Sequence, residues 1–484
     1  MIRLNLITIL RKALLAGTLT CLAVPAVANV ITDWDTKAVA IVAPAPLGQR
    51  ELAMVHVAMF DAVNAIERRY RPYLVQLTAL KTTSQDAAAA TAAATVLAGL
   101  HPQAAGEIKT ALAIYLAAIA DGEAKSDGIK LGEAVAAKVL QARANDGANA
   151  PDAYRPKTKP GVYVPTPITV ASVWPAVTPF ALTKPSQFRP QPPIALESTQ
   201  WAADFNELKA YGGKIGSKRS AEQTETARFW LMVGAPGYHP VARQLIIAKQ
   251  MSVIDSARFM ALYAVSLADA YIAVFDAKYH YEFWRPVTAI RIGDVNGNPA
   301  TELEATWQPI DNTPMHPEYP CAHCIQSGAA VAVIESVLGS RDISEVSITS
   351  STAPGVTHRW TNLDVFSEEI ANARIWAGFH YRFSTRVGTD MGHQIGEYRR
   401  EECDAIATRD GPALMNASAG LTDAGPAEDH RTNDSGEQSS RPGSIRPNIT
   451  RLHDARPFRD IRRKAQTKFV RRAADRQIAE FDEA

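Results

Sequence analysis

Apolar residues recur at helical spacing along most of the chain, and this pattern predicts a predominantly helical protein. The first clear segment spans residues 52–67, and Ala-rich segments follow at 86–100 and 104–145. Further helical patterns come later in the sequence, at residues 200–211, 221–234, 239–250, 254–282, 324–338 and 364–407. Runs that alternate apolar and polar residues, as half-buried strands do, are scarce. We therefore predict an all-α fold.

A Pro-rich segment divides these helical patterns into two groups. Residues 151–200 are dense in proline, which lacks the N–H group that a helix interior needs. We interpret the segment as a long irregular connection at the end of an N-terminal helical scaffold, residues 29–199. The second group, residues 200–412, is predicted to form a second helical bundle packed against the first.

The first residues have the features of an export signal. Three basic residues precede a mostly apolar run at 13–24, and Ala26 and Ala28 give the small-x-small pattern of a signal-peptidase site. We predict a signal peptide at residues 1–28 and a mature protein that is periplasmic or secreted. The run is shorter than the roughly 20 residues that cross a bilayer. We expect no transmembrane helix in the mature chain.

The C-terminal segment, residues 413–484, has a different composition. It is rich in Gly, Ser, Pro and charged residues, and its apolar residues show no periodicity. Between residues 441 and 476 it holds 12 Lys or Arg and three Asp. We predict a disordered basic tail, and the alternative is an arm that binds an anionic partner.

The balance of charge excludes some classes of function. The chain has 51 Lys and Arg against 50 Asp and Glu, and 46% of its residues are hydrophobic. A globular protein with a net charge of +1 is neither a typical nucleic-acid binder nor a typical membrane-surface binder. Any anion site must therefore come from local clustering of basic residues.

Cysteine usage leaves the redox chemistry open. Cleavage of the signal would remove Cys21 and leave Cys321, Cys324 and Cys403, an odd number that predicts no disulfide framework. The spacing of Cys321 and Cys324 is compatible with a redox motif, a local disulfide or half of a zinc site.

Three ordered segments carry the strongest candidate chemistry. The first holds Lys278 and Arg285 in KYHYEFWRP; on one helix, seven residues make nearly two turns and place both cations on one face, about 10 Å apart. In the second, TPMHPEYPCAHC, a helix that starts after Pro320 would present free N–H groups to an anion, with His323 beside them.

The third segment, ARIWAGFHYRFS, holds Arg374 and His380. Six residues turn a helix by about 240 degrees, so the two side chains do not share a face on a continuous helix. Either Arg374 reaches around, or a helix starts between them at Gly378. Taken singly, each of these cations is more typical of a solvated face, and each histidine of a structural role. Their order and proximity to one another favour a shared oxyanion site.

Together the three segments resemble the signature of the vanadium-dependent haloperoxidase and type 2 phosphatidic acid phosphatase superfamily. That signature is Lys, six residues, Arg-Pro; then Pro-Ser-Gly-His; then Ser-Arg, five residues, His, three residues, Asp. The flanking words RELAMVHVAMFDAVNAI and FWRPVTAIR and the stretch 307–320 are similar to the bacterial haloperoxidase branch. The resemblance covers residues 33–408 and implies two packed helical bundles.

The resemblance also implies a role for each matching residue. The cations Lys278, Arg285 and Arg374 would neutralise the oxygens of a bound vanadate or phosphate, with the backbone N–H of Ala322 as a further donor. His380 would be the axial ligand of vanadium, or the nucleophile of a phosphatase. His323 would be the acid-base group.

His316 occupies a position where the resembling enzymes carry Phe or His beside the oxyanion, which makes it a candidate for the halide site. The alternative is a histidine in a surface loop.

This chain departs from the family pattern at three positions. Cys321 stands where a Ser hydroxyl usually binds the anion, and a thiol is a weaker donor. Ala373 replaces the Ser before Arg374. Ser384 replaces the Asp expected to hold His380, and the imidazole would then lack an orienting carboxylate.

The sequence therefore predicts a vanadate-dependent haloperoxidase that oxidises halide with hydrogen peroxide to hypohalous acid. Its expected partners are small molecules (peroxide, halide and an organic acceptor) and no nucleic acid. One alternative is an exported acid phosphatase that uses the same residues, because bound vanadate resembles the transition state of phosphoryl transfer. Another is a non-catalytic relative that binds an anion or a partner.

Overall fold

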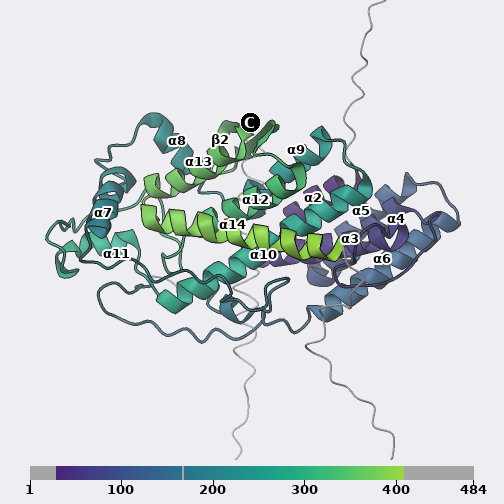
Figure 1. The fold of residues 1–484 in the computed structure, drawn as a ribbon, viewed down its shortest axis with the longest axis horizontal. Coiled ribbons are helices and arrows are strands. Elements are labelled where there is room, and N and C mark those ends of the chain that lie inside the picture. The colour runs from purple at the N-terminus through teal and green to yellow at the C-terminus, as the bar shows by residue number, and fades with distance from the viewer. Residues whose placement is uncertain (1–28, 166–167, 408–484) are drawn as a thin grey trace, which may run out of the picture. The chain divides into compact units, whose positions relative to one another are not determined.

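The computed structural model of this chain describes residues 29–165 and 168–407, with side chains described through residue 398. The predicted signal peptide (1–28) and the predicted basic tail (413–484) lie outside the described residues. Helices dominate the rest, which confirms the predicted fold class of packed helical bundles (Figure 1).

The first bundle consists of five helices in chain order. These are α2 (Val30–Ile41), α3 (Leu47–Glu67), α4 (Gln85–Leu100), α5 (Ala105–Ala117) and α6 (Glu123–Ala142). The Ala-rich α4 packs against α3 and α6, because small side chains let helix backbones approach closely. It begins at Ser84, whose side chain accepts a hydrogen bond from the backbone N–H of Ala87 at 3.2 Å.

The second group of helices follows the Pro-rich connection. It contains α7 (Thr199–Gly212), α8 (Ala221–Phe229), α9 (His239–Ala248), α10 (Val253–Tyr281), α11 (Pro286–Arg291), α12 (Ala322–Leu338), α13 (Leu363–Trp376) and α14 (Arg382–Ala407). Short 3₁₀ turns lie at Pro102–Ala104, Trp174–Ala176, Ala235–Gly237 and Gly293–Val295. The predicted continuous pattern at 364–407 is therefore two helices separated by a break.

Helix α10 is the centre of the structure and packs against both groups, with α3 on one side and α12 on another. Figure 1 shows it with α3, α4 and α6 toward one end and α7 and α11 toward the other. Its length and composition alone would suffice to cross a membrane. Its most apolar window is entirely buried by protein, as in the core helix of a globular fold.

The Pro-rich connection lies against α10 and is fixed to it by two carboxylates. Asp269 accepts hydrogen bonds from the backbone N–H groups of Phe180 and Ala181 at 2.6 and 2.8 Å. Asp276 pairs with the guanidinium of Arg189 through two contacts of 2.8 Å. Irregular backbone is thus held on the helix that carries Lys278 in its last turn.

One hairpin corrects the expectation of a purely helical chain. Strands β1 (Asp342–Ser350) and β2 (Ala353–Asn362) pair antiparallel, with Val346 opposite Trp360. Their buried side chains face α8, α9 and α13. Apolar and polar residues alternate in DISEVSITS, which is a strand signal that the sequence analysis did not identify.

A buried polar cluster ties the first bundle to α9. The carboxylate of Asp35 in α2 lies 2.7 Å from Nε2 of His56 in α3 and 2.6 Å from Nδ1 of His239. Its other oxygen accepts from the guanidinium of Arg243. The negative charge of Asp35 is thus balanced by the positive charge of Arg243. The Asp35 side chain joins α2, α3 and α9.

The crossing of α12 and α14 depends on glycine. A Cβ added at Gly392 would lie 2.2 Å from the carbonyl oxygen of Ile325, which belongs to the backbone of α12. We expect Gly392→Ala to lower the free energy of unfolding by about 2–4 kcal/mol, because two helices must move apart. Denaturant titration followed by far-UV circular dichroism measures the change.

The matched control is Gly106→Ala in α5, where an added Cβ meets nothing within 4 Å. It should raise stability by up to about 1 kcal/mol, the ordinary advantage of Ala over Gly in a helix. Equal effects of the two substitutions would contradict the proposed close contact.

Candidate oxyanion site

Lys278 and Arg285 converge on the same loop, but not for the reason inferred from their spacing. Helix α10 ends at Tyr281, and Glu282 adopts a left-handed conformation with φ 49°. Arg285 is the N-cap of α11. The two cations therefore do not share a helix face, which corrects that prediction; a chain reversal brings them together.

Both cations bind backbone carbonyl groups of the segment before α12. Nζ of Lys278 donates to the carbonyl oxygens of Pro317 and Glu318 at 3.0 and 2.6 Å. Nε of Arg285 donates to the carbonyl oxygen of His316 at 2.8 Å, and its Nη1 donates to that of Phe379 at 3.0 Å. These contacts hold the two loops that carry the candidate histidines.

The break between α13 and α14 positions Arg374 and His380. Gly378 has φ 78°, and a Cβ there would lie 2.5 Å from the carbonyl oxygen of Gly212, so conformation and space both require glycine. The helix does break near Gly378, but the next helix starts at Arg382, after His380, and not between Arg374 and His380 as the second alternative required. The backbone N–H groups of Phe379 and His380 both donate to the carbonyl oxygen of Arg374, at 3.1 and 3.3 Å.

Arg374 itself is 2% exposed, and its guanidinium donates to the carbonyl oxygen of Trp230. Its Cζ also lies 4.9 Å from the centre of the Phe379 ring. Its Nε is buried and has no hydrogen-bond partner among the described residues. A permanent cation with a spare donor inside the protein is suited to bind an anion.

His380 is held by a carboxylate that the sequence analysis did not single out. Its Nδ1 lies 2.8 Å from Oε1 of Glu318, and both side chains are at most 1% exposed. Oε1 also accepts from the backbone N–H of Tyr381 at 3.1 Å. Because an arginine N–H only donates, the 3.4 Å contact between Arg285 Nη1 and His380 Nε2 makes Nε2 an acceptor.

His323 lies in the first turn of α12, behind Cys321 as N-cap and Ala322 as first residue. Its Nε2 donates to the carbonyl oxygen of Met232 at 2.9 Å, which leaves Nδ1 as the acceptor of the neutral ring. His323 is 8% exposed. The helix start thus presents a proton-accepting nitrogen next to free backbone N–H groups.

Cys321 and Cys324 form a disulfide, which is one of the three possibilities that their spacing left open. The sulfur of Cys321 therefore carries no hydrogen and cannot donate to an oxyanion as the expected thiol would. It accepts instead from the N–H of Cys324 at 3.2 Å. Both residues are buried, and the disulfide lies against α14 at Gly388.

His316 is half-buried beside Arg285 and is not a free surface histidine. Nη2 of Arg285 lies 3.0 Å from its Nδ1, and its ring meets Phe275 edge-on with centroids 5.2 Å apart. Burial and the Arg285 cation lower its pKa well below the usual value. This places His316 next to the cations, as the halide-site prediction requires, while its halide role stays a prediction.

Burial lowers the pKa of every basic group in the site. Burial lowers the pKa of Lys278 well below its usual value, and it lowers the pKa of Arg285 to about 10 and of Arg374 to about 9. Burial also depresses the pKa of His323 and of His380, and the neighbouring cations depress both further. A bound anion would oppose every one of these shifts.

Glu318 is the one carboxylate among the described residues that acts electrostatically on this cation cluster. Burial raises its pKa to about 7, while Lys278, Arg285 and the Ser384 hydroxyl act in the opposite direction. One carboxylate against Lys278, Arg285 and Arg374 leaves an excess of positive charge in a buried site. This excess, together with the spare Nε of Arg374, fits a tetrahedral oxyanion such as vanadate or phosphate.

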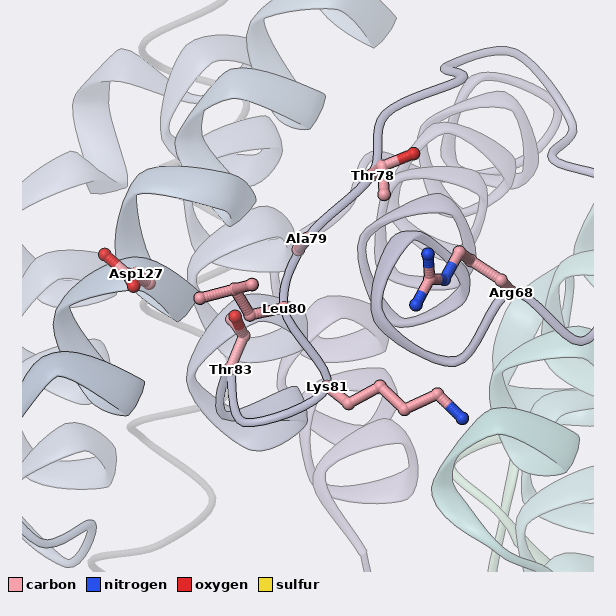
Figure 2. Close-up of a pocket in the computed structure, with 7 residues that line it drawn as sticks. All are labelled: Arg68, Thr78, Ala79, Leu80, Lys81, Thr83 and Asp127. Carbon is pink, nitrogen blue, oxygen red and sulfur yellow. The ribbon is translucent and has the colours of Figure 1, made fainter.

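Two other places in the structure fit an oxyanion or a metal less well. The Asp35, His56 and His239 cluster has the donor set of a metal site. Arg243 already balances the carboxylate, so a divalent cation would add unpaired positive charge in the interior. The hollow in Figure 2, about 410 Å³, is lined by residues around the end of α3, including Arg68 and Lys81, and by none of the predicted site residues.

Restoring a hydroxyl at the start of α12 should strengthen anion binding. We expect Cys321→Ser combined with Cys324→Ala to tighten vanadate binding about tenfold, because one hydrogen bond to a charged group contributes about 1.5 kcal/mol. Isothermal titration with orthovanadate measures the affinity. Cys324→Ala alone is the control, since it opens the disulfide and leaves a thiol. An equal affinity in both variants would contradict a direct contact from position 321.

Comparison with known proteins finds similarity to vanadium haloperoxidases. Residues 258–407 match the family model described as the VCPO second helical-bundle domain. The vanadium chloroperoxidase of Curvularia inaequalis is 26% identical over 192 residues, which cover 33% of this chain and 31% of that protein. The matched segment thus spans about a third of the curated relative.

Solved structures extend the likeness to both bundles. The crystal structure of the first bacterial vanadium-dependent iodoperoxidase has a TM-score of 0.65 at 23% identity, covering 76% of this chain and 94% of that one. The apo-type bacterial vanadium-dependent chloroperoxidase has a TM-score of 0.61 at 18% identity, covering 74% and 93%. The holo-type enzyme has a TM-score of 0.58 at 17% identity, covering 80% and 94%.

The fold is therefore the two-bundle helical fold of these enzymes. In its second bundle, residues 258–407, the chain is similar to the vanadium-dependent haloperoxidases.

Proposed function

We propose that this chain is an exported, vanadate-dependent haloperoxidase that oxidises a halide with hydrogen peroxide. The observation that carries the proposal is the buried excess of positive charge around His380, whose Nε2 is an acceptor beside Arg285. Bound vanadate would supply a Lewis-acid centre that activates peroxide toward halide. The residues of the chain would hold that group, orient it and manage protons.

Each side chain has a part in this scheme that its contacts support. Lys278, Arg285 and Arg374 would bind the oxygens of the anion, with the N–H of Ala322 at the helix start. His380 would hold the bound group through Nε2. His323 would take and return protons at Nδ1, because its Nε2 is engaged with a carbonyl group.

Bromide is the halide that we propose, since the resembling enzymes carry Phe or His at the position of His316, and His there is similar to the bromoperoxidases of that family. The Nδ1 contact with Arg285 places this ring at the edge of the cation cluster. Export is part of the proposal. The Cys321–Cys324 disulfide supports it, because disulfides persist in oxidising compartments.

The main alternative is an acid phosphatase that uses His380 as the nucleophile. The same acceptor nitrogen and the same cations suit a phosphoryl group, so the geometry favours neither activity. The relatives named above are haloperoxidases, and this resemblance is the reason to rank halide oxidation first. A non-catalytic anion binder is a third candidate, because Cys321 has lost its donor and Ser384 replaces a carboxylate.

Two assays on the purified protein separate these functions. The first supplies vanadate, bromide, hydrogen peroxide and a dye that can be brominated; the second supplies a phosphomonoester without vanadate. Dye bromination that depends on vanadate supports the proposal. Phosphate release that vanadate inhibits would replace it with the phosphatase, and a protein silent in both assays would refute both enzymes.

A further inference from the structure

The strongest unassigned feature of the site is the buried carboxylate of Glu318. It comes from the loop before α12, while the histidine that it contacts lies 62 residues later between α13 and α14. The backbone of Glu318 is fixed on both sides. Its N–H donates to the carbonyl oxygen of Phe283 at 2.9 Å, and its own carbonyl oxygen accepts from Lys278 at 2.6 Å.

We propose that Glu318 is the positioning residue of His380, and that it replaces from another loop the carboxylate missing at position 384. The assignment rests on the proposed function for the role of His380. In this chain Glu318 would then orient His380 although position 384 is Ser. The absence of Asp at position 384 would no longer argue against a catalytic site.

The hydrogen bonds determine which ring nitrogen of His380 carries the proton. Oε1 of Glu318 already accepts from the backbone N–H of Tyr381, so Nδ1 of His380 donates to the same oxygen across 2.8 Å. Nε2 then keeps its lone pair, in agreement with the donor Arg285 at 3.4 Å. An imidazole fixed in this tautomer offers Nε2 to vanadium or phosphorus, and the carboxylate raises its basicity.

Ser384 lies close to the Glu318 carboxyl group in the folded chain. Ser384 is fully buried, and its carbonyl oxygen accepts from the N–H of Cys321 at 3.3 Å. Its hydroxyl and Oε2 of Glu318 are both buried and have no hydrogen-bond partner among the described residues. A hydroxyl is too short and uncharged to replace a carboxylate, whereas Asp at 384 beside Glu318 would bury two like charges. In this chain Glu318 therefore supplies the carboxylate that Ser384 does not.

A purely structural anchor is the competing explanation, since Oε1 also accepts from the N–H of Tyr381 at 3.1 Å. An anchor would affect folding and the position of the loop. A positioning residue affects the tautomer and reactivity of His380. Moving the carboxylate from position 318 to position 384 distinguishes the two explanations.

The test compares four full-length proteins: wild type, Glu318→Gln, Glu318→Ala, and Glu318→Ala combined with Ser384→Asp. In each, ¹⁵N shifts of labelled histidine report the His380 tautomer, titration with orthovanadate or inorganic phosphate reports affinity, and thermal melting reports folding. The enzyme assay identified above gives kcat and KM separately.

We expect Glu318→Gln to melt near the wild type and to lower kcat about 10–100-fold, with KM changed less than about threefold. Glu318→Ala should mix the two tautomers of His380 and weaken oxyanion binding about tenfold or more. The double variant should recover the Nδ1–H tautomer and most of the lost affinity and kcat.

A double variant that folds but stays as impaired as Glu318→Ala would overturn the proposal, as would an unchanged tautomer in Glu318→Ala. Should Glu318→Ala fail to fold, Glu318→Gln and the double variant decide alone. The tautomer and phosphate titrations need no turnover. A protein without either enzyme activity would therefore refute the proposed function while leaving the assignment of Glu318 open to these readouts.

Discussion

Replacing His380 with alanine is expected to lower kcat at least about 1,000-fold in whichever assay the wild-type protein is active. The imidazole accepts from Arg285 at Nε2 and donates to Glu318 at Nδ1, so Nε2 is fixed as an acceptor. Without it, an oxyanion keeps its electrostatic partners but loses the axial ligand or nucleophile. Steady-state kinetics with saturating vanadate or phosphomonoester measure the loss.

His280→Ala is the matched control, because this exposed histidine lies near the end of α10 and its ring contacts the neighbouring Tyr281 ring. It should retain wild-type kcat. Turnover by His380→Ala within tenfold of the wild type would show that His380 has neither assigned role. Far-UV circular dichroism of both variants verifies that the helices remain folded.

The second large effect concerns stability, not chemistry. We expect Asp35→Asn to lower the free energy of unfolding by about 3–5 kcal/mol, because it removes the carboxylate that balances Arg243 inside the protein. The new amide would also direct donor hydrogens at His56 and His239, which both contact the same oxygen of Asp35. Denaturant titration monitored by circular dichroism measures the change.

Glu345→Gln provides the comparison for an exposed pair. Glu345 lies 2.8 Å from Arg359 across the hairpin, and both side chains are more than half exposed. The cost there should stay below about 1 kcal/mol, since water screens the pair. A loss from Asp35→Asn no larger than this would mean that the cluster contributes little to joining α2, α3 and α9.

The helices could be predicted because their signals are local. Apolar periodicity located residues 52–67, 254–282 and 324–338 within a few positions of α3, α10 and α12. The end of α10 was harder, since Glu282 takes a left-handed conformation that glycine or asparagine normally marks. The spacing of Lys278 and Arg285 therefore suggested one helix face where the chain in fact reverses.

The composition of the candidate site could be predicted only as far as the motif extends. The residues matched to the family signature come together, but their roles stay predictions until they are tested. Glu318 was missed although it lies inside the quoted segment, because its partner is 62 residues away and no spacing rule links them. The disulfide was one of three possibilities, since two cysteines three positions apart suit several chemistries.

The central position of α10 limits how this protein can be divided or recombined. One helix buries the core of the first bundle and also presents Lys278 to the second. A fragment that contained only the second bundle would expose an apolar surface long enough to enter a lipid bilayer or to aggregate. We therefore expect the two bundles to function only when they are kept together in one protein. A hybrid of two relatives would have to take α10 and its packing partners in both bundles from the same parent.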